Sequence, residues 1–183
     1  RAGVNAGNSI ASGGNYNVAI GDEAGTALTT GDQNVAVGFE ALSTEDAHGL
    51  NTAVGYRALK TLNAGAEGYN TAVGIDSGLS MTLGIENTLL GALTGDALTH
   101  ADFNTAIGST ALGADTLGSR SVAIGANSLN TQNFTTATNV YNVAVGYDAG
   151  TAITTGIFNS LHGALAGSSL TDADRNTAVG MNA

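Results

Sequence analysis

The stretch NTAVG, residues 51–55, is the unit from which most of this chain is built. A pentad of the form Asn-(Thr/Val/Ser)-(Ala/Leu)-(Val/Ile/Leu)-Gly, with Ser replacing Asn once, occurs ten times in 183 residues. The ten pentads begin at Asn17, Asn34, Asn51, Asn70, Asn87, Asn104, Ser121, Asn142, Asn159 and Asn176. Successive pentads start 17 residues apart, except after Asn51 and Ser121, where the intervals are 19 and 21 residues. Such a regular repeat indicates stacked, similar units rather than one globular core.

The composition excludes several classes of protein. Hydrophobic residues make up 43% of the chain and charged residues 11%, which is too apolar for intrinsic disorder. The chain has no cysteine, so it can form neither a disulfide nor a thiolate metal site. Its net charge of −10 argues against binding to nucleic acid or to an anionic membrane surface. No apolar run is long enough for a transmembrane helix, so we expect no direct membrane insertion of this segment.

Each pentad has the pattern of a short β-strand that ends at a glycine. Seventeen residues are too few for a strand and a crossover helix, but they suit one coil with two short strands and two turns. The Thr-rich segments TALTTG (26–31) and TAITTG (151–156) are the expected second strands. The sequence therefore predicts an all-β, parallel β-solenoid of about ten coils with about 17 residues per coil. We expect residues 1–183 to form one such domain, as a fragment of a longer fibre.

Two columns of equivalent residues have predicted roles in this solenoid. The pentad asparagines are expected to stack their side-chain amides from coil to coil, as asparagine ladders do in cross-β structures. The closing glycines, such as Gly21 and Gly38, are expected at a corner that needs a positive φ or a close approach of two backbones.

The two faces of the predicted strand differ in side-chain size. One face carries the second and fourth pentad positions, such as Val18 and Ile20, while the other carries mostly alanine. Both faces lack charge, so we expect one to lie inside the coil and the other to be covered by a partner. A closed cyclic oligomer is the simplest such arrangement, and a monomeric solenoid whose far wall covers both faces is the alternative.

SVAIGANS (121–128) and the nine other pentads resemble the head repeats of trimeric autotransporter adhesins. NTAVGYRAL (51–59) is also similar to repetitive phage tail-fibre proteins. The resemblance covers essentially the whole chain. It implies a left-handed β-roll, a homotrimer around a common axis and an extracellular location in a cell-surface or virion fibre. The implied function is attachment to a host, a matrix or a partner cell.

Two functions therefore stay open. The segment is either an adhesive module that contacts a glycan or protein receptor, or a passive spacer that projects a binding tip located elsewhere. Enzymatic activity is not expected, because the chain lacks the known catalytic motifs and its three histidines fall in different coils. We also expect no cofactor and no metal, since the acidic residues follow the corner glycines without the pattern of calcium-binding rolls.

The long turn at residues 130–141 is the candidate receptor-contact site, because insertions into a solenoid often carry function. Its amide and aromatic side chains are of the kind that bind sugars: Asn130, Gln132, Asn133, Phe134, Asn139 and Tyr141. The alternative is an ordinary solvated loop with one anchoring aromatic ring. Similar stretches such as YNVAIGDEAG (16–25) and YNVAVGYDAG (141–150) further indicate a super-repeat of three or four coils.

NSLHG (159–163) places His162 in the fourth pentad column, which otherwise holds Val, Ile or Leu. This column is expected to be buried, with Ser160 on the same face as the hydrogen-bond partner of a neutral imidazole. The other hypothesis is an axial polar site, in which three copies of His162 meet at the three-fold axis and bind water, an anion or a metal.

Overall fold

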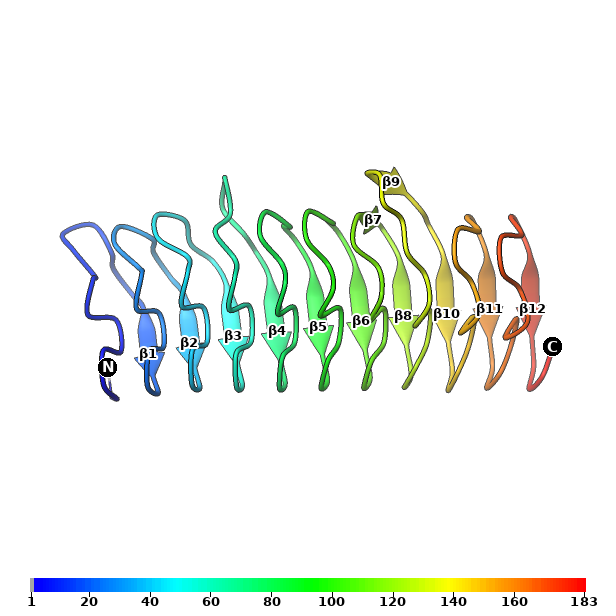
Figure 1. Cartoon of the computed structure of the whole chain (residues 1–183), viewed down its shortest axis with the longest axis horizontal. Coiled ribbons are helices and arrows are strands. Elements are labelled where there is room, and N and C mark those ends of the chain that lie inside the picture. Colours follow the sequence, from blue (N-terminus) through cyan, green and yellow to red (C-terminus); the bar gives the residue numbers. More distant parts are fainter. Residues whose placement is uncertain (1) are drawn as a thin grey trace.

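A computed structural model, which describes residues 2–183, shows the chain as a rod of stacked coils with the two termini at opposite ends (Figure 1). Each coil contributes one three-residue strand to a ten-stranded parallel sheet, and the described residues contain no helix. The strands of this sheet are β1 (Val18–Ile20), β2 (Val35–Val37), β3 (Thr52–Val54), β4 (Thr71–Val73), β5 (Thr88–Leu90), β6 (Thr105–Ile107), β8 (Val122–Ile124), β10 (Val143–Val145), β11 (Ser160–His162) and β12 (Thr177–Val179). The predicted parallel β-solenoid of about ten coils is thus confirmed. In residues 2–183 there is consequently no helix that could cross a membrane.

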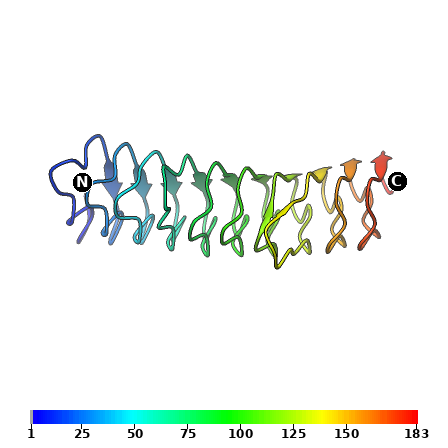
Figure 2. The same cartoon turned by 90° about the horizontal axis from the view of Figure 1, so that it is seen from above.

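Neighbouring strands pair at identical pentad positions, as Ala36 with Ala53 and Val37 with Val54. Equivalent residues of successive coils therefore form columns that run along the rod. The sheet occupies one side of the rod, and the turns occupy the other (Figure 2). The 17-residue interval follows from this register, because any other interval must be absorbed in a turn to keep the columns aligned.

The predicted second strand of each coil is wrong, since residues 26–31 and 151–156 form turns. Gly25 and Gly150 bend the chain there with φ of +55° and +61°. Stacking is maintained by threonine instead: the backbone N–H and the hydroxyl of Thr29 both donate to the carbonyl of Asp46, at 2.7 and 2.9 Å. Among the described residues, a second sheet forms only between β7 (Gly118–Ser119) and β9 (Thr138–Asn139).

The corner glycines behave as predicted. Their φ values lie between +121° and +144°, in the region that favours glycine. A Cβ atom on Gly74 would lie 2.2 Å from the carbonyl oxygen of Gly91 in the next corner. Both reasons for glycine, the positive φ and the close backbone approach, thus apply at the same column.

The asparagine column forms the predicted ladder inside the coils. Oδ1 of Asn70 accepts both the backbone and the side-chain N–H of Asn87, at 3.0 and 3.2 Å. The Asn87 amide also donates to the carbonyl of Ala101 in its own coil, at 2.8 Å. Each rung therefore joins two coils and closes one. It also satisfies buried backbone groups that the three-residue strands leave without a partner.

The interior is a single layer between the sheet and the turns. The third pentad position faces inward and is alanine in eight coils and leucine in two. The turns fill the space opposite with large, fully buried side chains: Leu28, Leu42, Leu59, Leu62, Met81, Leu98, Leu112, Leu129 and Ile153. Where the strand supplies Leu89, the adjacent turns have Gly78 and Gly95, whose added Cβ atoms would lie 2.9 and 3.0 Å from its methyl groups. Small residues thus oppose large ones across the coil.

The fourth pentad column points outward, so the expectation that it is buried in any version of the fold is wrong for the single chain. Ile20 and Leu90 are 45% and 46% exposed. The interior is already filled by the alanine column and the turn leucines, which leaves the larger strand side chains on the outside. The structure thereby identifies the face that is free to meet a partner.

Candidate functional site

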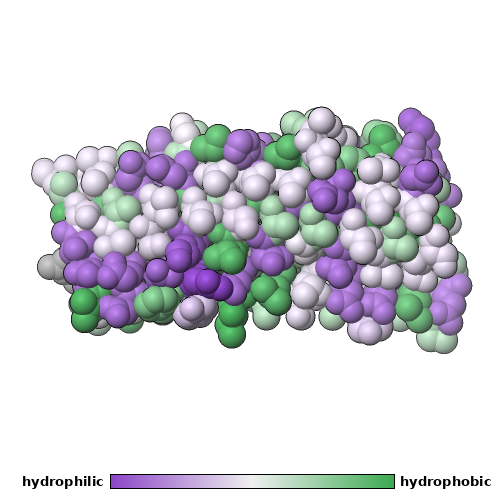
Figure 3. All heavy atoms as spheres, viewed as in Figure 1, coloured by the Kyte–Doolittle hydropathy of each residue, from purple (hydrophilic) through white to green (hydrophobic). Residues whose placement is uncertain are grey.

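The outward face of the ten-stranded sheet is the largest uniform surface of the rod. Figure 3 views the rod with the turns in front of the sheet, and hydrophobic residues lie there in separate groups among hydrophilic and near-neutral ones. On the sheet side, the second and fourth pentad columns hold only Thr, Val, Ile, Leu and Ser, apart from His162. An uncharged face of this length, on a chain of net charge −10, is typical of an association surface.

His162 lies in β11 on this outward face and is exposed to solvent in the single chain. Its Nε2 is 3.2 Å from Oγ of Ser160, the partner expected from the sequence. Its neighbours in the column are Val145 and Val179. His162 is therefore one polar rung in an otherwise apolar outward column, and the axial site stays a prediction that requires partner chains.

The long turn at 130–141 brings some candidate contact residues to the surface and buries others. It projects from the same edge of the rod as the long turn that follows β3 (Figure 1). Gln132 is fully buried and Phe134 is only 8% exposed, so these two side chains anchor the turn and do not face a receptor. The candidates that are exposed or half-buried are Asn130, Asn133, Asn139 and Tyr141.

Gln132 replaces a missing rung of the asparagine ladder. Ser121 is the one pentad start that is not asparagine, and its short side chain cannot span two coils. Nε2 of Gln132 donates to Oγ of Ser121 at 3.1 Å, while its Oε1 accepts the side-chain N–H of Asn142 at 2.9 Å. The sequence contains the signal for this role, because the equivalent residue of the other long coil is Leu62.

A fully buried carboxylate holds each long turn. Oδ1 of Asp115 accepts the backbone N–H groups of Gly118 and Phe134, both at 3.0 Å, and Oδ2 accepts from Gln132 at 2.6 Å. Glu45 accepts the backbone N–H groups of His48 and Ala64 in the same way, at 3.1 and 2.9 Å. Each carboxylate lies in the coil that precedes a long coil, and the two are four coils apart. Of the two periods considered for the super-repeat, the structure therefore favours four coils.

Burial raises the pKa of both Asp115 and Glu45, although hydrogen bonds from backbone N–H groups oppose the rise. The folded chain therefore holds a proton on these groups at a pH where the unfolded chain has released it. Stability from these groups is fully present at acid pH and falls as the pH rises from the unfolded pKa through the raised folded one.

The Asp115→Asn variant is expected to be less stable than the wild type, because the asparagine amide cannot accept the hydrogen bond from Gln132. This deficit should be larger at pH 4 than at pH 7, because only the wild type pays for ionising a buried group as the pH rises. Urea denaturation at both pH values measures it. The control is Asp172→Asn, which removes the same charge from an exposed position. A deficit that grows toward pH 7 would contradict the prediction.

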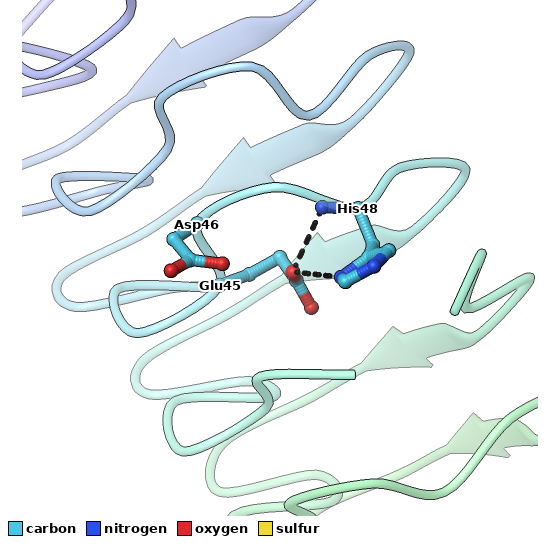
Figure 4. A group of neighbouring side chains, drawn as sticks. All are labelled: Glu45, Asp46 and His48. Atoms are coloured by element: carbon cyan, nitrogen blue, oxygen red, sulfur yellow. Dashed lines mark hydrogen bonds and ion pairs between the residues drawn. The ribbon is translucent and has the colours of Figure 1, made fainter. Parts of the chain in front are cut away.

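The turn that contains Glu45 also brings Asp46 and His48 together (Figure 4). One possible ligand atom from each lies within 4.8 Å of the others. Nδ1 of His48 is buried without a hydrogen-bond partner and lies 3.6 Å from Oε1 of Glu45. At the equivalent place four coils along, Asp115 makes the same backbone contacts beside Gly118, so the turn needs the carboxylate but not the histidine. We assign the group to turn stabilisation, and the expected absence of a metal stays a prediction.

The three histidines lie in three different coils, and in the described part of the chain no hydrogen bond joins any two of them. His100 is exposed in a turn, while His48 and His162 have the separate surroundings described above. This arrangement offers no acid–base pair for catalysis. The absence of enzymatic activity was expected from the sequence on the same grounds and stays a prediction.

The sequence analysis missed the column that immediately precedes each pentad. Its residues all have positive φ, between +49° and +66°, which turns their side chains out from the coil. Five of them are aromatic and exposed: Tyr16, Tyr69, Phe103, Tyr141 and Phe158. Two others are Arg120 and Arg175. The recurrence of an aromatic residue before asparagine is the signal that could have identified this column.

Comparison with known proteins adds no assignment, because no family model, no curated protein and no solved structure matches this chain.

Proposed function

We propose that this chain is a non-enzymatic segment of an extracellular surface fibre that mediates attachment to a host or cell-surface receptor. Three copies are arranged around a common axis, as left-handed rolls, in a cell-surface or virion fibre of the adhesin or tail-fibre kind. The observation that carries this proposal is the uncharged outward face that continues along all ten strands of the rod.

The outward columns support self-association for a physical reason. Covering apolar surface contributes about 25 cal/mol per Å², and here the half-exposed Val, Ile and Leu side chains repeat in every coil. Partner chains with the same repeat present the same columns at the same spacing. A closed ring of copies covers the face on every chain, whereas open association would continue indefinitely.

The long turns support the attachment role. They project from one edge of the rod (Figure 1), and their exposed amide and aromatic groups lie outside the sheet face that association would cover. The alternative function is that of a passive spacer that projects a binding tip located elsewhere. The uniformity of the remaining coils is compatible with that alternative.

The wild-type chain is expected to have a mass in solution of three times 18.0 kDa, measured by light scattering after size exclusion. The Leu90→Glu variant should shift toward the monomer, because it places a charge in the middle of the outward column. The control is Leu83→Glu, which makes the same change at a residue of similar exposure in a turn. A monomeric wild type, or equal effects of the two variants, would contradict the trimer.

Attachment is tested separately by measuring adhesion of the wild-type chain to cultured cells and to a glycan array. Binding that is lost on replacement of the exposed residues of the 130–141 turn supports an adhesive module. The absence of binding to any of these surfaces favours the passive spacer.

A further inference from the structure

We propose that an exposed strip of aromatic and arginine side chains beside the 130–141 turn binds saccharides that carry a carboxylate. The inference rests on the proposed attachment function and names the ligand class for it. The residues of this arginine strip are Phe103, Arg120, Asn139, Tyr141, Phe158 and Arg175.

The arginine strip is continuous across five successive coils. The guanidinium of Arg120 lies 4.4 Å from the ring centroid of Phe103, and its Nε donates to Oδ1 of Asn139 at 3.0 Å. Two residues further along the chain, Tyr141 begins a second stack. Its ring is 5.6 Å from that of Phe158, at an interplanar angle of 9°.

The second stack ends in Arg175, whose guanidinium lies 5.2 Å from the centroid of the Phe158 ring. The two arginines therefore stand three coils apart, with aromatic rings between them. Stacking on a ring fixes the plane of a guanidinium and leaves its N–H groups directed at solvent.

Neither strip arginine has an acidic partner in the part of the chain that the structure describes. The other arginine described, Arg57, shows what such a group binds. It stacks on the ring of Tyr56 at 4.9 Å and holds the carboxylate of Asp76 through Nε and Nη2, both at 2.8 Å. Arg120 has the same aromatic support, but only a neutral amide at Nε and no hydrogen bond at its Nη groups. The vacant edge of Arg120 suits a carboxylate supplied by a ligand.

The neighbouring groups favour a saccharide over an acidic protein or a nucleic acid. Aromatic rings and the Asn139 amide supply the stacking surface and hydrogen bonds that hydroxylated rings need. The chain itself carries a net charge of −10, which repels a polyanion along its whole length. A sugar with a single carboxylate needs only the local pairing with one guanidinium.

The test uses the complete chain with two matched probes, 3′-sialyllactose and lactose, in saturation-transfer NMR and isothermal titration. We expect sialyllactose to bind and lactose to bind at least about tenfold more weakly, since the difference is one charged hydrogen-bonded pair. Arg120→Gln should weaken sialyllactose binding by a similar factor. This variant should fold, because Gln33 occupies the equivalent position with φ of +57°.

The control variant is Lys60→Gln, which removes the same charge from a residue already paired with Glu40 at 2.7 Å. It should leave sialyllactose binding unchanged. Equal losses in the two variants, or equal binding of both sugars, would overturn the inference while attachment stands. Binding of tetraglutamate in place of sialyllactose would also overturn it, in favour of a protein partner.

The inference and the proposed function fail in different ways. If the chain adheres to cells but binds no acidic sugar, the arginine strip is not the site and the attachment function stands. If neither sugar binding nor adhesion occurs, both are overturned and the spacer function is favoured.

Discussion

Replacement of Gly74 by alanine is expected to destabilise the rod by more than about 3 kcal/mol, which combines a strained positive φ with an overpacked contact. Gly74 has φ of +142°, and an added Cβ would lie 2.2 Å from the carbonyl oxygen of Gly91. The obstacle is backbone, so it cannot move without breaking the stacking of two coils. Urea denaturation followed by circular dichroism measures the loss.

A matched control separates the two causes. Gly180 occupies the same corner column with φ of +121°, but a Cβ there meets nothing within 4 Å. The Gly180→Ala variant should therefore show only the conformational strain, about 1–3 kcal/mol at most, in a terminal coil. Equal effects of the two substitutions would show that close stacking of the corners contributes nothing.

The Asn87→Ala variant is expected to lose about 3–5 kcal/mol, because each buried group left without its partner costs about 1–3 kcal/mol. Oδ1 of Asn87 accepts the backbone N–H of Asn104 at 2.9 Å, and its amide donates to Asn70 and to the carbonyl of Ala101. The substitution leaves these groups in an interior that is closed to water. Denaturation midpoints report the loss, and hydrogen exchange should show it concentrated in the two adjoining coils.

The control for this substitution is Asn63→Ala, at an exposed position where the asparagine side chain makes no hydrogen bond. It should change the free energy of unfolding by less than about 0.5 kcal/mol. A similarly small effect at Asn87 would mean that water or neighbouring groups satisfy the ladder, and the ladder would then not be a main source of stability.

Most of the repeat could be predicted from the sequence, because each prediction depended on a local property. Glycine at a corner and an amide at a fixed spacing have the same meaning in every coil. The second strand could not be predicted, because the turn at Gly25 and the bonds from Thr29 to the next coil depend on how the coils stack. The long turn at 130–141 was recognised by its length, yet its composition could not separate the buried Gln132 from the exposed Asn133.

The buried polar groups show the same limit. Glu45, Asp115 and Gln132 stand where other coils have Leu or Met, and a sequence pattern gives no reason for a charge inside a coil. The reason appears only when the next coil is in place, because Asp115 and Glu45 accept backbone N–H groups from a long turn 19 residues away. The arginine strip likewise consists of contacts between coils, and neither Arg120 nor Phe103 indicates it alone.

The sequence by itself determined the number of coils, the register of the strands, the glycine corners and the asparagine ladder, because a strict period leaves only one way to stack equal units. Only the tertiary structure decided which strand face is inside. The turns deliver leucine side chains to the interior of each coil, and the space that remains admits alanine in most coils. The larger Val, Ile and Leu side chains, and His162 with them, are therefore on the outside.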